Sequence, residues 1–297
     1  MRLYRLFIRV IRIQWGTSVT KLSVMVMCGR SPRHLYVANR LCTVANVIAI
    51  VQEAGGHWTF KKALKSLRPL HLWRKVSRRL RDRRGDAGSD ESRFFFGHEE
   101  PKLDRPYLVT LVPYVNDPKV VELADRLRPD VIAVFGTSLI RGPLLTRGRL
   151  GIVNLHGGLS PEYRGADCTF WALYNGEPEK VGCTLHFVDS GIDTGRLIAH
   201  VCPEVHEGDD ELILFWRSVR DSAEVYGEFL DRMARGELLG ENQIAKGRLY
   251  QVKDRGSKQE RYLAERLSEG LLKGVHLPKR LYWFGSAASI MHGQAHQ

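Results

Sequence analysis

Short apolar runs alternate with amphipathic segments along this chain, and that alternation limits the folds it can adopt. The run LSVMVMC ends in a turn that contains Gly29 and Pro32, and it is followed by the helix-like LYVANRLCTVA and a second apolar run, NVIAIVQEAG. A strand, a helix and another strand in this order form the unit from which parallel sheets are built. We therefore predict an α/β, Rossmann-like fold, in which a mostly parallel twisted sheet is flanked by helices.

The same alternation resumes after residue 105 and extends the predicted sheet. Pro118 stands near the start of one amphipathic segment and Pro129 just after its end, which are positions that proline favours around a helix. Strand-and-turn segments are predicted over 105–112, 131–140, 150–158, 181–189, 196–205 and 247–253, and helices over 117–130, 166–176 and 209–235.

The formal net charge of +12 belongs to two segments of the chain. Residues 1–20 carry four arginines and no acidic residue, and residues 61–84 carry eleven lysines and arginines against the single Asp82. Subtracting these contributions of +4 and +10 leaves the rest of the chain at −2. Because that remainder is nearly neutral, we do not expect nucleic acid as the partner.

These segments set the expected domain organisation. Residues 1–20 form a basic N-terminal extension, 21–205 the main domain with a basic helical insertion at about 57–105, and 206–297 a helical and mixed C-terminal extension. The arginines of the N-terminal extension recur at helical spacing, which suits a membrane-surface anchor, but periodicity alone is weak and we favour a loosely docked or disordered segment. In the insertion, Trp58 and Trp73 among basic residues suit an anionic membrane surface or an RNA backbone. We favour a solvated helical insertion, followed by the loop-like DAGSDESR, because charge runs are usually exposed faces.

The cysteines give no sign of a metal site or a disulfide framework. They are scattered without a C-x-x-C pair or the Cys/His spacing of a zinc site: Cys28, Cys42, Cys168, Cys183 and Cys202. We expect no metal and a reducing cytoplasmic location, with peripheral contact at a membrane as the alternative. The longest apolar runs are far shorter than the roughly 20 residues that cross a bilayer, so no spanning segment is expected.

Polar side chains that suit acyl-transfer chemistry follow two predicted strands. Asn154 and His156 stand two residues apart at the end of one strand, so their side chains project to the same side. Asp193 lies in a glycine-containing acidic turn after the next strand. An amide and a protonated imidazole can stabilise the oxyanion that forms at a carbonyl under attack. Asp193 can then hold the charge of the imidazole and, directly or through a water, receive the proton of an attacking amine.

The segment NLHGGLSPEYRG, followed by VDSGIDTG, resembles the signature of the folate-dependent formyltransferases, which include glycinamide ribonucleotide, methionyl-tRNA and sugar N-formyltransferases. In that family an Asn-x-His motif, usually followed by Pro-Ser-Leu-Leu-Pro and Arg-Gly, precedes a catalytic Asp in a Leu/Ile-Asp-x-Gly turn. Asn154, His156 and Asp193 match the three catalytic positions. The resemblance is good over about 128–198 and general over 21–51.

This chain departs from the family motif next to the catalytic positions. Gly157 and Gly158 replace the frequent Pro-Ser, and Ser160 replaces a frequent Leu. None of these changes removes a catalytic group. We expect them to affect the shape of the loop and the choice of acceptor.

The resemblance implies 10-formyltetrahydrofolate as the formyl donor and no metal. It also implies which residues bind that co-substrate, through the pteridine pocket and the turn beside it: Ser138, Leu139, Ile140, Asp189 and Gly191. Arg164 and Gly165 are candidates for holding a donor tail or an acceptor phosphate, with a surface role as the alternative for the arginine. Gly29 and Arg30, at the end of the first strand, are candidates for a substrate anion, and a solvated turn is the alternative there.

The acceptor is expected to be a small-molecule amine. The aromatic pair Phe170 and Trp171 favours an amino sugar, or a sugar nucleotide, over glycinamide ribonucleotide. A transfer RNA acceptor is less favoured, because the residues after 198 open with a long helix and leave little room for the C-terminal barrel usual in methionyl-tRNA formyltransferases. Two other classes remain open: a hydrolase of the same folate donor, and a non-catalytic membrane-associated binding protein. The sequence leaves the oligomeric state open.

Overall fold

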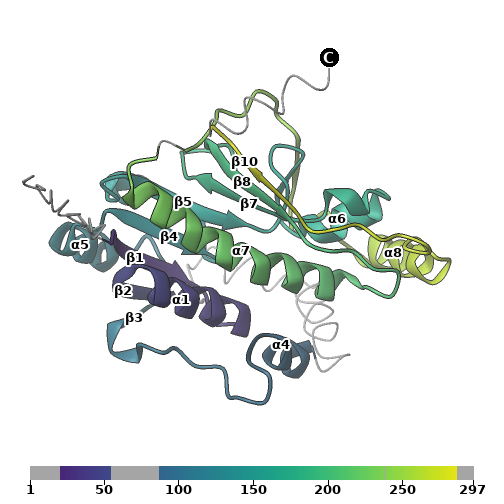
Figure 1. Ribbon diagram of the computed structural model, residues 1–297, viewed down its shortest axis with the longest axis horizontal. Coiled ribbons are helices and arrows are strands. Elements are labelled where there is room, and N and C mark those ends of the chain that lie inside the picture. The colour runs from purple at the N-terminus through teal and green to yellow at the C-terminus, as the bar shows by residue number, and fades with distance from the viewer. Residues whose placement is uncertain (1–20, 55–86, 238, 286–297) are drawn as a thin grey trace, which may run out of the picture.

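The computed structural model describes residues 21–54, 87–237 and 239–285. Its centre is an eight-stranded sheet with the order β10-β8-β7-β5-β4-β1-β2-β3 (Figure 1). The parallel part contains β1 (Ser23–Cys28), β2 (Asn46–Glu53), β3 (Val109–Val112), β4 (Val131–Phe135) and β5 (Gly151–His156). The antiparallel part contains β7 (Cys183–Phe187), β8 (Leu197–Cys202) and β10 (Arg280–Trp283). Strand β5 therefore stands at the junction of the two parts.

One face of the sheet is covered by α1 (Pro32–Val44), α4 (Ala87–Phe96) and α7 (Glu211–Ala234), which lie side by side in Figure 1. Leu41 of α1 and Phe229 of α7 are fully buried against strand side chains, and each such burial contributes about 1.5–3 kcal/mol. The hydroxyl of Tyr226 donates a hydrogen bond of 2.8 Å to the carbonyl oxygen of Val153. This bond ties α7 to the strand that carries Asn154.

The opposite face is covered by α5 (Pro118–Leu127) and the short 3-10 helix Gly142–Thr146, which bury a separate cluster against Met25 and Met27. The sequence explains both ends of α5. The Asp117 side chain accepts a hydrogen bond of 3.0 Å from the backbone N–H of Lys119, and Arg128 ends the helix in the left-handed conformation. Other 3-10 helices lie at Pro106–Leu108 and Pro178–Lys180.

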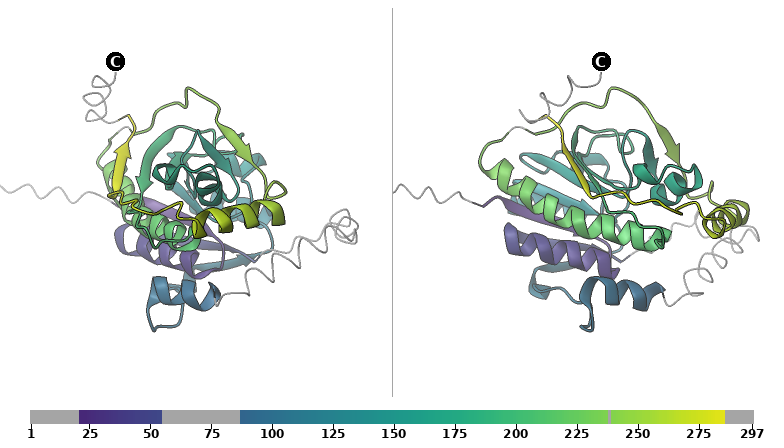
Figure 2. Two further views of the ribbon diagram at one scale, coloured as in Figure 1. Left: turned by 90° about the vertical axis from the view of Figure 1, so that its right-hand side faces the viewer. Right: turned by 45° about the vertical axis from the view of Figure 1, so that its right-hand side comes forward.

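A third apolar cluster lies beyond one end of the sheet, around α6 (Cys168–Tyr174) and α8 (Ser257–Ser268) (Figure 2). A two-stranded sheet of β6 (Tyr163–Gly165) and β9 (Arg248–Tyr250) belongs to it. The ring of Tyr250 stacks on those of Trp171 and Tyr163, with centroid distances of 4.7 and 5.7 Å. These stacks hold the late strand β9 beside the loop that follows β5.

The predicted Rossmann-like architecture is confirmed, and every strand or helix segment predicted within the described residues contains one of these elements. The prediction of a loop over 86–93 was wrong, because α4 forms there. Phe94 packs against Trp216 of α7, and Glu91 accepts two hydrogen bonds of 2.8 Å from the guanidinium of Arg33. Tertiary contacts that no local pattern reveals thus stabilise this helix.

Several predictions lie outside the described residues. These are the N-terminal extension at 1–20 and the basic stretch of the insertion, which falls within 55–86. The sequence analysis did not predict the helix α8 or the edge strand β10. Within the described ranges, no helix is both long enough and apolar enough to cross a membrane.

Candidate active site

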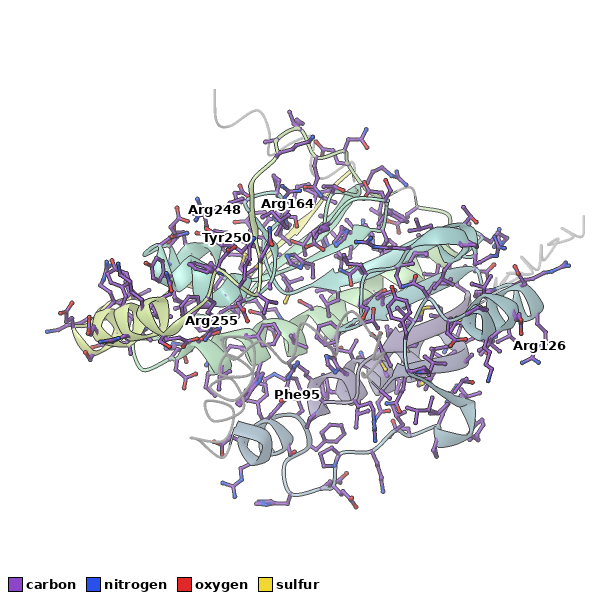
Figure 3. The ribbon with its side chains drawn as sticks, turned by 180° about the vertical axis from the view of Figure 1, so that it is seen from behind. Phe95, Arg126, Arg164, Arg248, Tyr250 and Arg255 are labelled. Atoms are coloured by element: carbon purple, nitrogen blue, oxygen red, sulfur yellow. The ribbon has the colours of Figure 1, made fainter. Side chains whose placement is uncertain are left out.

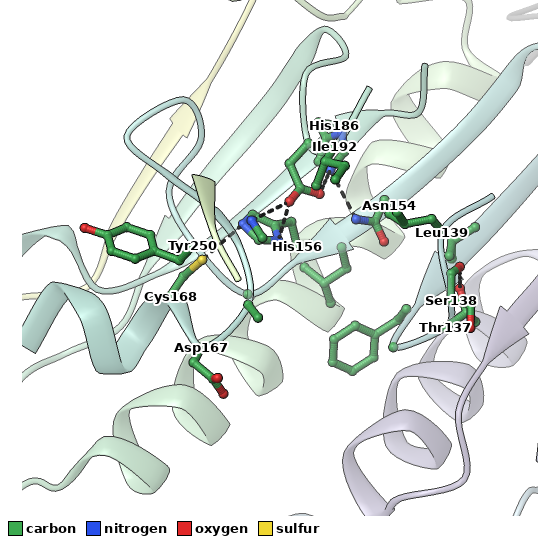
Figure 4. Close-up of a pocket in the computed structure, with 18 of the residues that line it drawn as sticks. Thr137, Ser138, Leu139, Asn154, His156, Asp167, Cys168, His186, Ile192 and Tyr250 are labelled. Carbon is green, nitrogen blue, oxygen red and sulfur yellow. Dashed lines mark hydrogen bonds and ion pairs between the residues drawn. The ribbon is translucent and has the colours of Figure 1, made fainter. Parts of the chain in front are cut away.

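A cavity of about 880 Å³ lies at the ends of β4 and β5 (Figure 4). One side of it is formed by the loop after β4 and the turn Asp189–Asp193, and the other side by the start of α6, the start of α7 and the residues around β9. Asn154, His156 and Asp193 line the space between these sides. The structure therefore brings the three predicted catalytic side chains to one cavity.

His156 is buried, with 7% of its side chain exposed, and both of its ring nitrogens face hydrogen-bond acceptors. Nε2 lies 3.0 Å from the carbonyl oxygen of Tyr163, and Nδ1 lies 3.5 Å from Oδ2 of Asp193. Burial lowers the pKa of His156, and the nearby carboxylate of Asp193 offsets this only in part. Burial of the ring therefore favours its neutral form. The protonated His156 expected from the sequence stays a prediction.

Asp193 occupies a left-handed backbone conformation, with φ of +52°, at a turn that several groups support. Its Oδ2 accepts a hydrogen bond of 2.9 Å from the backbone N–H of Gly165. Burial acts to raise the pKa of Asp193, but the positive charge that His156 or His186 carries when protonated, together with this N–H, holds the pKa below its ordinary value. The carboxylate is thus ionised at neutral pH and directed at the two imidazoles.

His186 is a site residue that the sequence reasoning missed. It lies opposite Asn154 in the β5–β7 pairing, and its Nε2 is 3.1 Å from Nδ2 of Asn154 and 3.5 Å from Oδ1 of Asp193. Its Nδ1 lies 2.8 Å from the carbonyl oxygen of Phe187, so Nδ1 carries the proton and Nε2 accepts from Asn154. This contact fixes the Asn154 amide and leaves its second hydrogen for a ligand.

The loop after β4 is held by side chains from two other elements. Glu53, at the end of β2, accepts a hydrogen bond of 2.6 Å from the N–H of Ser138. Asn116 donates to the carbonyl of Leu139 at 2.8 Å and accepts from the N–H of Arg141 at 2.6 Å. Together with Ile140 and residues 189–193, this loop lines one side of the cavity.

The other side of the cavity is lined by Gly165, Asp167 and Gln251, with Phe215 of α7. A Cβ atom built on Gly157 would stand 2.8 Å from Cε2 of Phe215. The glycine that replaces the frequent proline of the motif therefore leaves space for this ring. This side of the cavity thus has the hydrogen-bonding groups of Asp167 and Gln251 beside the aromatic ring of Phe215.

The remaining predicted residues divide into those at the cavity and those away from it. Ser138, Leu139, Ile140, Asp189, Gly191 and Gly165 line the cavity, and Gly29, Arg30 and Arg164 do not. Arg164 lies beside Arg248 and Tyr250 (Figure 3), and its guanidinium donates to the carbonyls of Gly247 at 2.8 Å and Ile192 at 3.4 Å. It thus braces the turn that carries Asp193.

The aromatic pair proposed to favour an amino sugar is not at the cavity. Phe170 and Trp171 are 1% and 4% exposed and belong to the core around α6. That argument for the acceptor therefore fails. In the part of the chain that the structure describes, no group of three or more His, Cys, Asp or Glu side chains is arranged to hold a metal ion.

The residues of the site lie in a part of the chain that matches a known family. Residues 108–226, which include Asn154, His156 and Asp193, match the family model described as formyl transferase. This part of the chain is similar to the formyltransferase family. The matched region contains β3 to β8 and the first two thirds of α7, whereas β9, α8 and β10 lie outside it.

Similar proteins include methionyl-tRNA formyltransferases of Caldanaerobacter subterraneus, 34% identical over 129 residues, and of Citrifermentans bemidjiense, 38% identical over 131 residues. Each match covers 43% of this chain and 41% of the relative, so it spans about two fifths of the length of these curated relatives.

Solved structures with the same fold include a sugar N-formyltransferase from Shewanella, with 15% identity and a TM-score of 0.53, and a 4-N formyltransferase from Francisella tularensis, with 14% identity and a TM-score of 0.50. Both comparisons cover 83% of this chain and 87% of the other.

Proposed function

We propose that this formyltransferase transfers a formyl group from 10-formyltetrahydrofolate to the primary amine of an amino sugar or sugar nucleotide. The observation that carries the proposal is the convergence of Asn154, His156 and Asp193 on one cavity between two differently lined sides. The side formed by the loop at Ser138–Ile140 and the turn Asp189–Asp193 would hold the pteridine of the donor. The side formed by Asp167, Gln251 and Phe215 would hold the acceptor.

The hydrogen bonds of the site support the following reaction. The amine nitrogen attacks the formyl carbon, and the carbonyl oxygen takes the negative charge that the free hydrogen of Asn154 Nδ2 would stabilise. The proton of the amine passes to the His156–Asp193 pair and resides on Nδ1 of His156, where the Asp193 carboxylate stabilises the imidazolium. The bond from the formyl carbon to the donor nitrogen then breaks, and that nitrogen takes the proton back. The products are a formamide and the deformylated folate.

An amino sugar suits the acceptor side because a sugar ring offers both hydroxyl groups and an apolar face. The carboxylate of Asp167 can accept hydrogen bonds from hydroxyls, and the ring of Phe215 offers an apolar surface next to the catalytic groups. Gly29 and Arg30 follow β1 and precede Arg33 and His34, which line the cavity, by two intervening residues. We propose that this end of the acceptor side takes the phosphate of a nucleotide-linked substrate.

Charged initiator tRNA is a second candidate acceptor, favoured by the 34–38% identity to methionyl-tRNA formyltransferases across the matched region. Against it, the described residues 239–285 do not form a separate domain that could bind RNA, since β9 and β10 pair with strands of the catalytic part.

A screen of the purified protein separates these candidates. The protein is incubated with 10-formyltetrahydrofolate and, in turn, amino-sugar nucleotides, glycinamide ribonucleotide and charged initiator tRNA, and formylation is read by the mass of the acceptor. Formylation of an amino-sugar nucleotide supports the proposal, and formylation of another acceptor alone overturns it. Release of formate without any amine would instead favour a hydrolase. An Asp193→Asn protein serves as the matched control.

A further inference from the structure

The segment after α7 returns to the turn that carries Asp193. Leu197 and Glu241 exchange two backbone hydrogen bonds of 2.8 Å, and from this bridge the chain runs past Gln243 to β9. Residues 239–250, which form this segment, lie after residue 226, where the match to the formyl transferase model ends. This chain therefore supports its catalytic turn with residues that the family match does not include.

The side-chain amide of Gln243 joins two carbonyls of that turn. Its Nε2 lies 2.9 Å from the carbonyl oxygen of Asp193 and 2.7 Å from that of Gly195. An amide nitrogen carries two hydrogens, so both hydrogen bonds can form at once, whereas an oxygen in its place would be repelled. The two bonds hold the backbone that follows Asp193, a residue in the left-handed conformation, which is strained for most residues other than glycine.

We propose that Gln243 is a positioning residue that sets the carboxylate of Asp193 for formyl transfer. This inference rests on the proposed function. The contacts on the carboxylate itself agree with it, because β9 pairs with β6, and Gly165 of β6 donates its N–H to Oδ2 of Asp193 at 2.9 Å. One segment of the chain thus fixes both the backbone and the side chain of Asp193.

Loss of the amide would let the turn relax and move the Asp193 carboxylate from His156. The gap from Oδ2 to Nδ1 of His156 is already 3.5 Å, so a further shift weakens the stabilisation of the imidazolium. A displacement of about 1 Å in a catalytic group can lower turnover by about 100-fold. We expect a larger effect on kcat than on the KM for the donor, because the carboxylate acts on the proton and not on binding.

The test compares three variants at Gln243 with the exposed neighbour Asn242→Ala as control. Gln243→Leu keeps the volume without a donor, Gln243→Glu presents an oxygen to the carbonyls at neutral pH, and Gln243→Lys keeps a donor on a chain of similar length. Hydrogen–deuterium exchange of the 189–195 peptide reports the turn independently of activity, and steady-state kinetics on the acceptor found in the screen give kcat and KM.

The expected result is faster exchange at 189–195 in the Leu and Glu variants, a fall in kcat of about 10- to 100-fold, and partial rescue by Lys. Unchanged exchange in the Leu variant overturns the proposal. Faster exchange with unchanged kcat also overturns it, because Gln243 would then act on the fold alone. A parent protein that formylates no acceptor in the screen overturns the proposed function, and the exchange comparison then decides separately whether Gln243 holds the turn.

Discussion

Replacement of Asn154 by alanine tests the proposed catalytic site at the group with the simplest role. The Asn154 amide makes one hydrogen bond within the protein, of 3.1 Å to His186, and its other hydrogen is available for the developing oxyanion. Removing one such donor lowers kcat by about 10²- to 10³-fold, or about 2.7–4 kcal/mol of transition-state stabilisation. The cost to folding is one hydrogen bond, about 1 kcal/mol. We therefore expect a large loss of turnover with a fall in Tm of only about 2–4 °C.

The assay is formyl transfer at saturating donor and acceptor, together with thermal unfolding of the same preparations. Asn39→Ala is a matched control, because it also removes a hydrogen-bonding amide. The amide of Asn39, on α1, bonds to backbone groups of Lys102 and Asp104 and lies outside the cavity. It should show a similar change in Tm and parental kcat. If Asn154→Ala kept kcat within about threefold of the parent, a difference below 1 kcal/mol, the oxyanion role would be refuted.

Two further substitutions test the supports of the cavity. Glu53→Gln replaces the carboxylate that accepts a hydrogen bond from the Ser138 N–H by a neutral amide. Weakening this hydrogen bond by about 1 kcal/mol should raise the KM for the folate donor about fivefold and leave kcat nearly unchanged. An unaltered KM in steady-state kinetics would contradict this expectation. Arg255→Met removes a guanidinium that is 8% exposed and makes hydrogen bonds of 2.6 and 2.8 Å to Glu211. Chemical denaturation at pH 7 should show a free energy of unfolding that is lower by about 3–5 kcal/mol. Burial raises the pKa of Glu211 and Arg255 offsets this, so the variant raises that pKa further in the folded state. A carboxyl pKa that is raised in the folded state lowers stability only at pH values above the pKa of that group in the unfolded chain. The loss of unfolding free energy should therefore be smaller at pH 5 than at pH 7. An equal loss at pH 5 and pH 7 would count against the charge argument.

The sequence predicted the positions of Asn154 and His156 because their signal is local. Two polar residues at alternate positions at the end of an apolar strand must project to one side, and no other part of the chain changes that. His186 could have been found by the same reasoning, since it alternates correctly within VGCTLHFVD and needs only the antiparallel pairing with β5 to face Asn154.

The supporting contacts could not be predicted in this way. Gln243 lies in a stretch without regular periodicity, and its partners at Asp193 and Gly195 are about fifty residues earlier in the chain. The charge of His156 could not be predicted from the sequence either, because it depends on how deeply the ring is buried. Helix α4 was missed for a related reason, since its phenylalanines are stabilised by α1 and α7 and not by its own propensity.

The return of the late segment to the catalytic turn has a consequence for protein synthesis. A ribosome that has translated residue 200 has already produced Asn154, His156 and Asp193, but neither Gln243 nor the strand β9 that lines the cavity. Strand β8 also has an unpaired edge until β10 emerges. A nascent chain interrupted there would carry the full motif without a complete site, and its open edge would be exposed to other chains. The candidate site is therefore completed only after Gln243 and β9 have been translated, and the edge of β8 is paired only after β10 has emerged.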